Sequence, residues 1–301
     1  MRKKRKKRIA GRLLGVLFFA ALILLILSGV SKLMDHLGSY SENTTISARP
    51  PEPEPEQPQP PQEPEQLQPD GAPVLDGLPR STLDAEKFRR ENGITYYDGL
   101  PAARVGIDVS SHQQTIDWER VAAAGVEFAM IRVGYRGYSE GTLQADEYFE
   151  DNFRGAQAAG LRVGVYFFSQ AISEEEAVEE AQFVLQLLDG RGLEYPVMYD
   201  WEDVEAAART DGMDRLRLTA CADAFCRTVQ DAGYRAGVYF NQVFGYQELN
   251  LLSLQDYVFW LAEYRDVPEF LYAFQMWQYT NDGRIDGIEG AVDLDLSFGN
   301  P

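Results

Sequence analysis

The residues with the clearest chemical potential form the motif Tyr199-Asp200-Trp201-Glu202, which follows the apolar run of residues 196–198. Side chains alternate along a strand, so Asp200 and Glu202 would share one face while Tyr199 and Trp201 share the other. The rise along a strand separates the Cα atoms of the two acids by about 6.6 Å. This spacing allows the carboxyl separation of ~5–5.5 Å that retaining glycosidases use.

Two neighbouring carboxyl groups in a partly dry site can divide the work of acid catalysis. Their repulsion pushes their pKa values apart, so one acid keeps its proton while the other stays ionised. The protonated acid can protonate a leaving group, and the ionised acid can attack or stabilise a cationic centre. A D-x-E pair at a strand end also occurs as surface charge or as a cation site, so the pair alone does not decide between these interpretations.

Further polar and aromatic residues lie at the ends of other predicted strands. The acids are Asp108, Glu263, Asp293 and Asp295. The aromatic residues are Tyr135, Tyr166, Phe168, Trp201, Tyr239, Trp260, Tyr264, Trp277 and Tyr279. Carboxylates among aromatic rings suit an uncharged sugar polymer, because rings stack on pyranose faces and acids catalyse hydrolysis.

The elements that must position these residues alternate between strands and helices. Short apolar runs predict strands over 104–110, 127–135, 162–170, 195–202, 235–241, 257–264, 274–280 and 292–298. Amphipathic segments predict helices over 116–124, 146–159, 174–189 and 214–232, and a short helix near 244–254. This alternation indicates a parallel sheet. Eight strands in roughly 200 residues predict a closed TIM-like α/β barrel without helices between its last three strands. A doubly wound open sheet is the alternative, but no G-x-G-x-x-G follows the first strand.

The N-terminus predicts a membrane anchor. Eight of the first twelve residues are basic, and Leu13–Val30 is an uncharged, mostly apolar run of eighteen residues. A helix of this length spans roughly 27 Å, close to the hydrocarbon thickness of a bilayer. The basic tail, residues 1–12, should remain cytoplasmic, so that the chain after a membrane helix over 13–33 is extracellular. A cleaved signal peptide is the alternative, but the apolar run is longer than a typical signal and no A-x-A site follows it.

Residues 34–100 are predicted to link this anchor to a folded domain over 101–301. Eleven of the fifteen prolines lie between Pro50 and Pro79, among many glutamates. Such sequence buries too little apolar surface to fold and extends as polyproline II. Thirty such residues span on the order of 90 Å, which makes a spacer a simpler interpretation than a ligand for an adaptor domain.

Composition excludes several classes of function. The chain carries a net charge of −19, and beyond the basic tail 20 basic residues face 47 acidic ones. A body this acidic would be repelled by phosphate backbones, which argues against nucleic-acid binding. The only histidines are His36 and His112, so we expect no His-rich metal site and no cofactor. Cys221 and Cys226 would lie on divergent faces of a helix as free thiols. The oligomeric state cannot be deduced from the sequence.

From about Arg104 to Phe298, the chain resembles the family 25 glycoside hydrolases, which are lysozymes of the N-acetylmuramidase type. The matching segments are GIDVSSHQQTIDWERVAAAGVEFAMIRVGY, DNFRGAQAAGLRVGVYFFSQA, VMYDWE, AGVYFN, WLAEY and WQYTNDGRIDGIEGAVDLDLSF. The resemblance implies a barrel of five β/α units followed by three strands. It also implies cleavage of the β-1,4 bond between N-acetylmuramic acid and N-acetylglucosamine in peptidoglycan.

The resemblance also implies residue roles. Glu202 matches the general acid, and Asp200 matches a second carboxylate that either attacks the sugar or stabilises attack by its own 2-acetamido group. Asp108 and Asp293 match acids that line the cleft, where they would orient the substrate and separate the pKa values of the central pair. The residues expected to bind substrate are Tyr135, Tyr166, Tyr239, Trp260, Tyr264, Trp277 and Tyr279.

Two positions depart from the family pattern. Asp295 stands where the last motif usually has Asn, so it either adds negative charge near the cleft or points away from it. Phe167 stands where many relatives have His. A third residue, Arg132, lies within a predicted core strand and needs an acidic partner, for which Asp108 and Asp200 are the candidates.

The sequence therefore predicts a single-pass cell-membrane protein whose extracellular domain hydrolyses peptidoglycan glycan strands. A catalytically silent wall-binding module on a membrane stalk is the alternative. A metal-dependent deacetylase that uses Asp108 and His112 is a poorer interpretation, because the predicted domain contains a single histidine.

Overall fold

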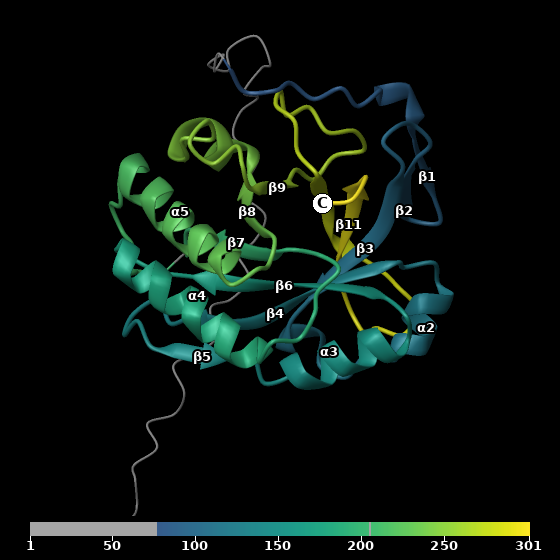
Figure 1. The fold of residues 1–301 in the computed structure, drawn as a ribbon. Helices are drawn as coiled ribbons and strands as arrows, with labels where there is room; N and C mark the ends of the chain where they lie inside the picture. The colour runs from purple at the N-terminus through teal and green to yellow at the C-terminus, as the bar shows by residue number, and fades with distance from the viewer. Residues whose placement is uncertain (1–76, 205) are drawn as a thin grey trace, which may run out of the picture. The chain divides into compact units, whose positions relative to one another are not determined.

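The computed structural model describes residues 77–204 and 206–301 (Figure 1). The predicted tail 1–12, the predicted membrane helix 13–33 and the linker up to residue 76 lie outside the described residues. Within the described part of the chain, no helix is long and apolar enough to span a bilayer.

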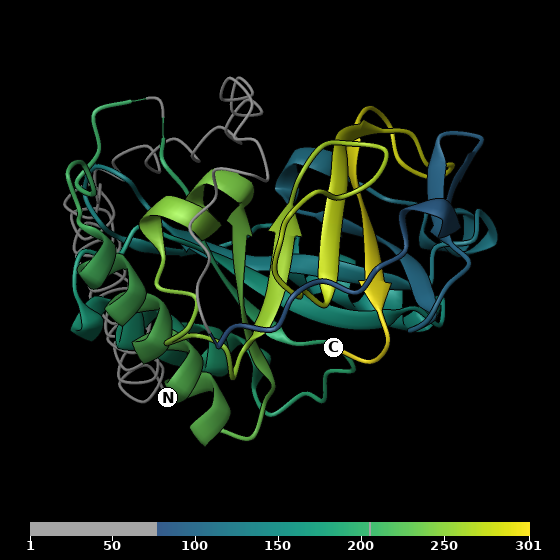
Figure 2. The same ribbon diagram turned by 90° about the horizontal axis from the view of Figure 1, so that it is seen from above.

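Eight strands form a closed barrel (Figures 1 and 2). They are β3 (Ala103–Val109), β4 (Phe128–Arg136), β6 (Arg162–Ser169), β7 (Val197–Trp201), β8 (Ala236–Asn241), β9 (Val258–Ala262), β10 (Met276–Gly283) and β11 (Val292–Phe298). Neighbouring strands from β3 to β10 are parallel, and β11 closes the barrel by pairing antiparallel with both β10 and β3. All eight predicted strands and the predicted barrel are confirmed.

Helices cover the strands of the first half of the barrel, as predicted. They are α2 (Trp118–Ala123), α3 (Phe149–Ala158), α4 (Glu174–Leu188) and α5 (Arg215–Asp231), followed by the π-helical turn η4 (Phe244–Glu248). The start of α4 follows from its sequence, because the Ser173 side chain accepts the Glu176 N–H. The Glu176 side chain in turn accepts the N–H of Ile172, one residue before the cap. Cys221 and Cys226 are buried free thiols on α5, as expected.

The outer face of the last strands is covered by a segment that was predicted to be linker. Strands β1 (Phe88–Glu91) and β2 (Ile94–Tyr97) form a hairpin after the short 3₁₀ turn η2 (Ala85–Lys87). Phe88 packs edge-on against Trp277 of β10 with ring centroids 5.5 Å apart, and Figure 2 shows this blue segment beside the yellow strands. The folded unit therefore begins before the predicted boundary at residue 101. A further short strand, β5 (Leu143–Ala145), pairs with β4 and was not predicted.

Apolar side chains fill the barrel interior below the carboxyl ends of the strands. Phe128 and Tyr195 stack with ring centroids 4.4 Å apart and close the lower end. Met130, Met198 and Met276 pack with them. This layer confines any open space inside the barrel to its upper end, where the parallel strands terminate.

Candidate active site

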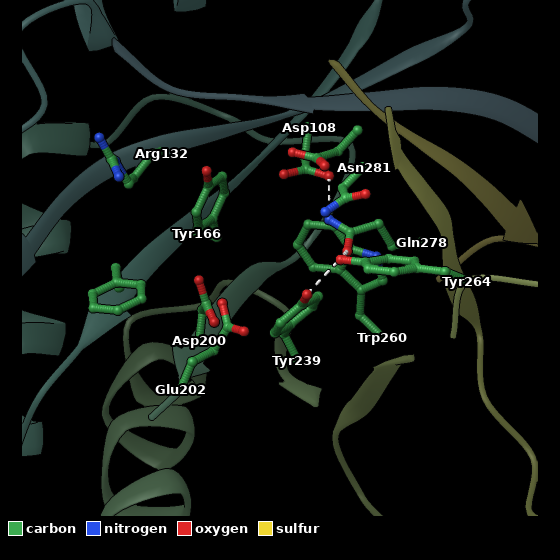
Figure 3. Close-up of a pocket in the computed structure, with 12 residues that line it drawn as sticks. Asp108, Arg132, Tyr166, Asp200, Glu202, Tyr239, Trp260, Tyr264, Gln278 and Asn281 are labelled. Carbon is green, nitrogen blue, oxygen red and sulfur yellow. Dashed lines mark hydrogen bonds between the residues drawn. The ribbon is translucent and has the colours of Figure 1, made fainter. Parts of the chain in front are cut away.

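A pocket opens at the carboxyl ends of the barrel strands and encloses about 540 Å³, including its open mouth. Its lining residues are Asp108, Arg132, Tyr166, Phe168, Asp200, Glu202, Tyr239, Trp260, Tyr264, Gln278, Asn281 and Asp293 (Figure 3). The four acids predicted as catalytic, which come from three different strands, are therefore brought together in one pocket.

Strand β7 supplies the central pair. Asp200 and Glu202 both point into the pocket and lie side by side in Figure 3. Tyr199 and Trp201 point outward and belong to the apolar layer between the barrel and its helices. The predicted alternation along this strand is confirmed. Asp200 lies deep, with 5% of its surface exposed, whereas Glu202 is only half-buried, at the end of the strand.

The surroundings of both acids favour protonation. Burial raises the pKa of Asp200 well above its ordinary value, and Asp108 and Asp293 raise it further, while Arg132 opposes them. Burial likewise raises the pKa of Glu202, and the negative charge of Asp200 adds to the effect. Asp200 Oδ1 is buried and accepts no hydrogen bond from the described residues. One of two such adjacent acids can therefore remain protonated above the pH at which an ordinary carboxylic acid ionises.

Gln278 of β10 connects Asp108 to two tyrosines, and sequence analysis missed it. Its Nε2 donates to Asp108 Oδ2 over 2.8 Å. Its Oε1 accepts from the hydroxyl groups of Tyr239 and Tyr264, each over 2.9 Å (Figure 3). A signal was present, because an amide in the middle of a buried, otherwise aromatic strand requires polar partners.

Four of the seven predicted aromatic residues line the pocket. They are Tyr166, Tyr239, Trp260 and Tyr264. Tyr264 is the most exposed of the four and lies at the pocket mouth, where β9 ends. Rings therefore stand beside the acids, as the sequence predicted for a sugar site.

The remaining three aromatic residues lie elsewhere. Tyr135 bonds to the Gln144 side chain of β5 and does not line the pocket. Trp277 and Tyr279 are buried on the outer face of β10, beneath the β1–β2 hairpin. Because side chains alternate and Gln278 points inward, its two neighbours must point outward. Trp277 and Tyr279 were expected to contact substrate, but their side chains lie outside this pocket.

Arg132 has a different partner from the two candidates. Its Nε donates to Asp146 Oδ2 over 2.9 Å and its Nη2 donates to Ser111 Oγ over 3.2 Å. Both Arg132 and Asp146 are buried, so each charge is neutralised by the other within the protein interior. The charge of Arg132 also acts on Asp200, whose pKa it lowers. Arg132 still lines the pocket and places positive charge near its acids.

Two other predicted polar residues stabilise loops outside the pocket. Glu263 follows β9 and accepts the N–H groups of Glu269 and Phe270, which orders the loop before β10. His112 lies in the 3₁₀ turn η3 (Ser111–Gln113), where its N–H bonds to Ser110 Oγ. Neither residue lines the pocket.

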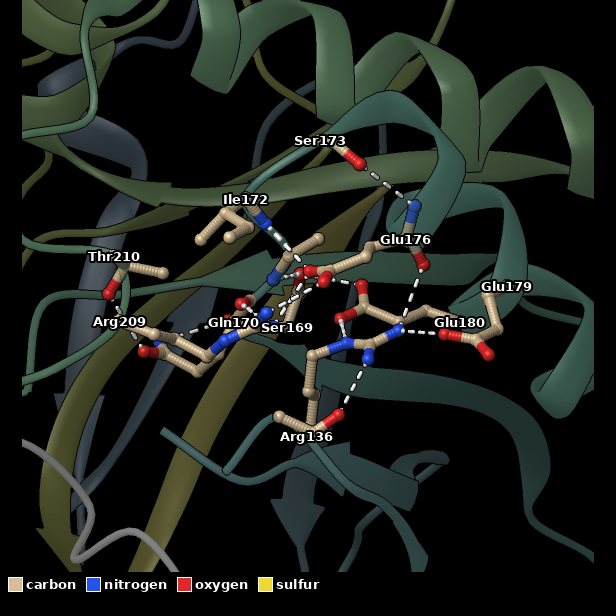
Figure 4. A network of polar contacts seen from close by, with 12 residues as sticks. Arg136, Ser169, Gln170, Ile172, Ser173, Glu176, Glu179, Glu180, Arg209 and Thr210 are labelled. Atoms are coloured by element: carbon tan, nitrogen blue, oxygen red, sulfur yellow. Dashed lines mark hydrogen bonds and ion pairs between the residues drawn. The ribbon is translucent and has the colours of Figure 1, made fainter. Parts of the chain in front are cut away.

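A polar network joins the end of β6, the start of α4 and the segment after β7 (Figure 4). Gln170, at the end of β6, donates to the Glu202 carbonyl over 2.9 Å and accepts from Thr210 Oγ1 over 3.0 Å. Arg209 clamps Glu176 of α4 with two hydrogen bonds of 2.7 Å. Residues between β7 and α5 are therefore bound to both the end of β6 and α4, which holds the backbone at Glu202.

The same network contains a buried ion pair. Arg136 of β4 donates to Glu180 of α4 over 2.7 Å, and neither side chain is appreciably exposed. Ser169 Oγ donates to the other Glu180 oxygen over 2.6 Å. Burial nevertheless raises the pKa of Glu180 to about 7.

A closed, mainly parallel barrel with a carboxylate pair and aromatic rings at its mouth defines a glycoside hydrolase type of site. The sequence profile of the family described as "Glycosyl hydrolases family 25" matches residues 107–288, which is more than half of the chain. The chain belongs to this family and is a glycoside hydrolase of the lysozyme type.

Similar proteins with an assigned activity include lysozymes. The chain is 28% identical to the autolytic lysozyme of Clostridium acetobutylicum over 191 residues, which cover 63% of this chain and 54% of that protein. It is 28% identical to lysozyme M1 of Streptomyces globisporus over 202 residues, which cover 62% and 65% of the two chains.

A solved structure has the same fold. The modular autolysin LytC from Streptococcus pneumoniae, in complex with a synthetic peptidoglycan ligand, superposes with a TM-score of 0.60 and 26% identity. The match covers 70% of this chain and 52% of LytC. The chain thus spans about half the length of LytC and of the clostridial lysozyme.

Proposed function

We propose that this protein is a membrane-anchored muramidase that cleaves the β-1,4 bond between N-acetylmuramic acid and N-acetylglucosamine in peptidoglycan. The observation that carries the proposal is the position of Asp200 and Glu202, which share one face of β7 inside a pocket lined by aromatic residues. Lysozyme relatives and the peptidoglycan ligand of LytC support the choice of substrate.

In this mechanism, Glu202 is the general acid. Its raised pKa keeps the proton available at higher pH than in an ordinary glutamic acid, and its position at the end of β7 lets it reach the glycosidic oxygen of a sugar chain that crosses the pocket. Proton transfer from Glu202 neutralises the departing oxygen as the glycosidic bond breaks. Gln170 supports this geometry through its bond to the Glu202 carbonyl.

Asp200 acts on the other reacting centre. It is deeper than Glu202, so it faces the sugar ring rather than the leaving group. It either attacks the anomeric carbon or orients the substrate 2-acetamido group, whose oxygen then attacks in its place. Detection of a glycosyl-enzyme ester by mass spectrometry would assign the attack to Asp200, whereas inhibition by a thiazoline analogue of the sugar would assign it to the substrate.

Asp108 and Asp293 complete the site without taking part in bond making. Both acids line the pocket, and Asp293 raises the pKa values of Asp200 and Glu202. Their oxygens can accept hydrogen bonds from sugar hydroxyl and amide groups, which would align the glycan across the central pair.

Product analysis tests the function. The full chain, purified in detergent, should release soluble fragments from purified cell walls, with N-acetylmuramic acid at the new reducing ends by mass spectrometry. Reducing ends of N-acetylglucosamine would show that the bond assignment is wrong. Binding to walls without release of fragments would favour the catalytically silent binding module.

The rings at the pocket mouth should determine substrate affinity. Tyr264→Ala should raise KM about fivefold to tenfold with little change in kcat, because loss of a stacked ring costs roughly 1–1.5 kcal/mol of binding. Kinetics on a soluble glycan fragment provide the measurement. The matched control is Tyr135→Ala, which removes a ring outside the pocket. An equal rise in KM for both variants would contradict the stacking role.

The sequence before residue 77 supports the anchoring part of the proposal. The basic tail and the apolar segment Leu13–Val30 support insertion with the N-terminus inside the cell, and the Pro-rich segment supports a spacer that lets the barrel reach the wall. Membrane fractions should contain the full chain, and external protease should remove the barrel from intact protoplasts. Recovery of the barrel in the culture medium would indicate that the anchor is cleaved.

A further inference from the structure

Asp295 lies in the barrel interior next to the pocket, and it is not among the four acids of the proposed mechanism. It follows Asp293 by two residues on β11, so both side chains face inward. In the antiparallel pairing of β11 with β3, Asp293 stands opposite Asp108 and Asp295 stands opposite Gly106, which carries no side chain. Asp108 and Asp295 are therefore diagonal neighbours on one inner face.

The hydrogen bonds of this pair are complete only if it holds a proton. Asp295 Oδ1 accepts the Trp260 Nε1 proton over 2.9 Å, and Asp108 Oδ2 accepts from Gln278 over 2.8 Å. Asp295 Oδ2 is fully buried and receives no N–H from the described residues. The carboxyl group diagonal to it on the inner face is that of Asp108. Two carboxyl groups form a hydrogen bond only when one of them is protonated.

The surrounding charges also require this proton. The acids that act on the pair are Asp293 from β11 and Glu202 from the end of β7, and Asp200 of β7 lies next to Asp108. The facing neutral groups are Tyr166 of β6, Tyr239 of β8, Trp260 of β9, Tyr264 after β9 and Gln278 of β10. The nearby cation is Arg132 of β4, which is bound to Asp146. Burial and these neighbours raise the pKa values of both Asp108 and Asp295 well above the usual range.

We propose that Asp295 is a positioning residue of the pocket, which shares one proton with Asp108 and so fixes the orientation and charge of that acid. Asp108 carries the proton on Oδ1 and donates it to Asp295 Oδ2, while Trp260 stabilises the negative charge on Asp295. The charge of the pair thus lies one layer below the pocket, and Asp108 presents a neutral carboxyl group to the substrate. The part of the proposal that concerns substrate rests on the proposed function, whereas the shared proton does not.

Substitution of Asp295 by asparagine tests the shared proton. The amide Oδ1 can still accept from Trp260, and its Nδ2–H₂ can donate to Asp108, which would then be ionised. A protonated pair binds one more proton in the folded than in the unfolded state, so the wild type loses stability as the pH rises from about 4 towards neutrality. Asp295→Asn removes this proton. The unfolding constant of the wild type should therefore rise relative to that of the variant by about tenfold per pH unit over this range.

The experiment is urea unfolding of the full chain in detergent across a pH series, with Asp256→Asn as the matched control. That control also removes one aspartate carboxyl group, but from an exposed position before β9, and its stability should follow the pH dependence of the wild type. Infrared difference spectra should show a protonated-carboxyl band in the wild type that Asp295→Asn lacks. Parallel pH dependence of the wild type and Asp295→Asn, or failure of the variant to fold, would overturn the shared proton.

Activity measurements separate this inference from the proposed function. Asp295→Asn should still clear cell walls, but with its pH profile moved relative to the wild type, because it restores the charge on Asp108. An unmoved profile would refute the effect of Asp295 on the pocket. Absence of wall clearing by the wild type would refute the proposed function and leave the unfolding result intact.

Discussion

Glu202→Gln should lower kcat on purified cell walls by about 10²–10⁴-fold, the usual contribution of a positioned general acid. Glutamine keeps the size and the backbone contact with Gln170 but has no proton to transfer. The variant should therefore fold normally and still bind walls. Rates of turbidity loss and a wall pull-down measure the two properties separately.

Two comparisons make this result specific. Asp203→Asn, which removes the exposed acid next in sequence, should retain activity. An aryl glycoside with a good leaving group needs little protonation, so Glu202→Gln should lose much less activity on that substrate than on walls. Wall hydrolysis by Glu202→Gln at the wild-type rate would refute the assignment of the acid.

Arg136→Met should lower the free energy of unfolding by about 3–5 kcal/mol near neutral pH, because it leaves Glu180 buried without its cation. The loss should depend on pH. The folded-state pKa of Glu180 is about 7, above its unfolded value of about 4.5, so stability from its bound proton is lost as the pH rises between these values. Removing the cation raises that pKa further and extends the loss to higher pH.

Urea unfolding at about pH 5 and about pH 8 tests this prediction. Arg136→Met should be more destabilised at the higher pH, and the double variant with Glu180→Gln should recover much of the loss. Glu179→Gln is the control, because Glu179 also contacts Arg136 but is 59% exposed, and it should change stability by less than about 1 kcal/mol. Equal stability of Arg136→Met and wild type at both pH values would contradict the account.

The local sequence was sufficient to predict the barrel and its central acids. The strand and helix periods identified the eight strands and four main helices, because each strand is a short apolar run ended by turn residues. Alternation along β7 placed Asp200 and Glu202 on the inner face. Both results depend on spacing within single elements, which the sequence contains directly.

Features that depend on distant segments were not predictable in the same way. The partner of Arg132 is Asp146, which reaches it from the segment after β5. Trp277 and Tyr279 were assigned to the wrong face of β10. A strand that is buried on both sides and mostly aromatic does not show which residues point inward. The polar Gln278 between them was the one residue that indicated the inward face. The β1–β2 hairpin carried a readable signal in Asn92-Gly93, a two-residue turn with positive φ at both positions. The composition of the linker that precedes it concealed that signal.

The pH dependence of kcat/KM tests the central claim most directly, since this quantity reports the pKa values of the free enzyme. A general acid must be protonated, so activity falls as the pH rises through its pKa. Burial and the Asp200 charge raise the pKa of Glu202 well above 4.5, so we expect kcat/KM on a soluble glycan to persist well above pH 4.5. We also expect the alkaline decline to weaken for an aryl glycoside. A decline on the natural glycan centred near pH 4.5, or one that is identical for both substrates, would contradict the central claim.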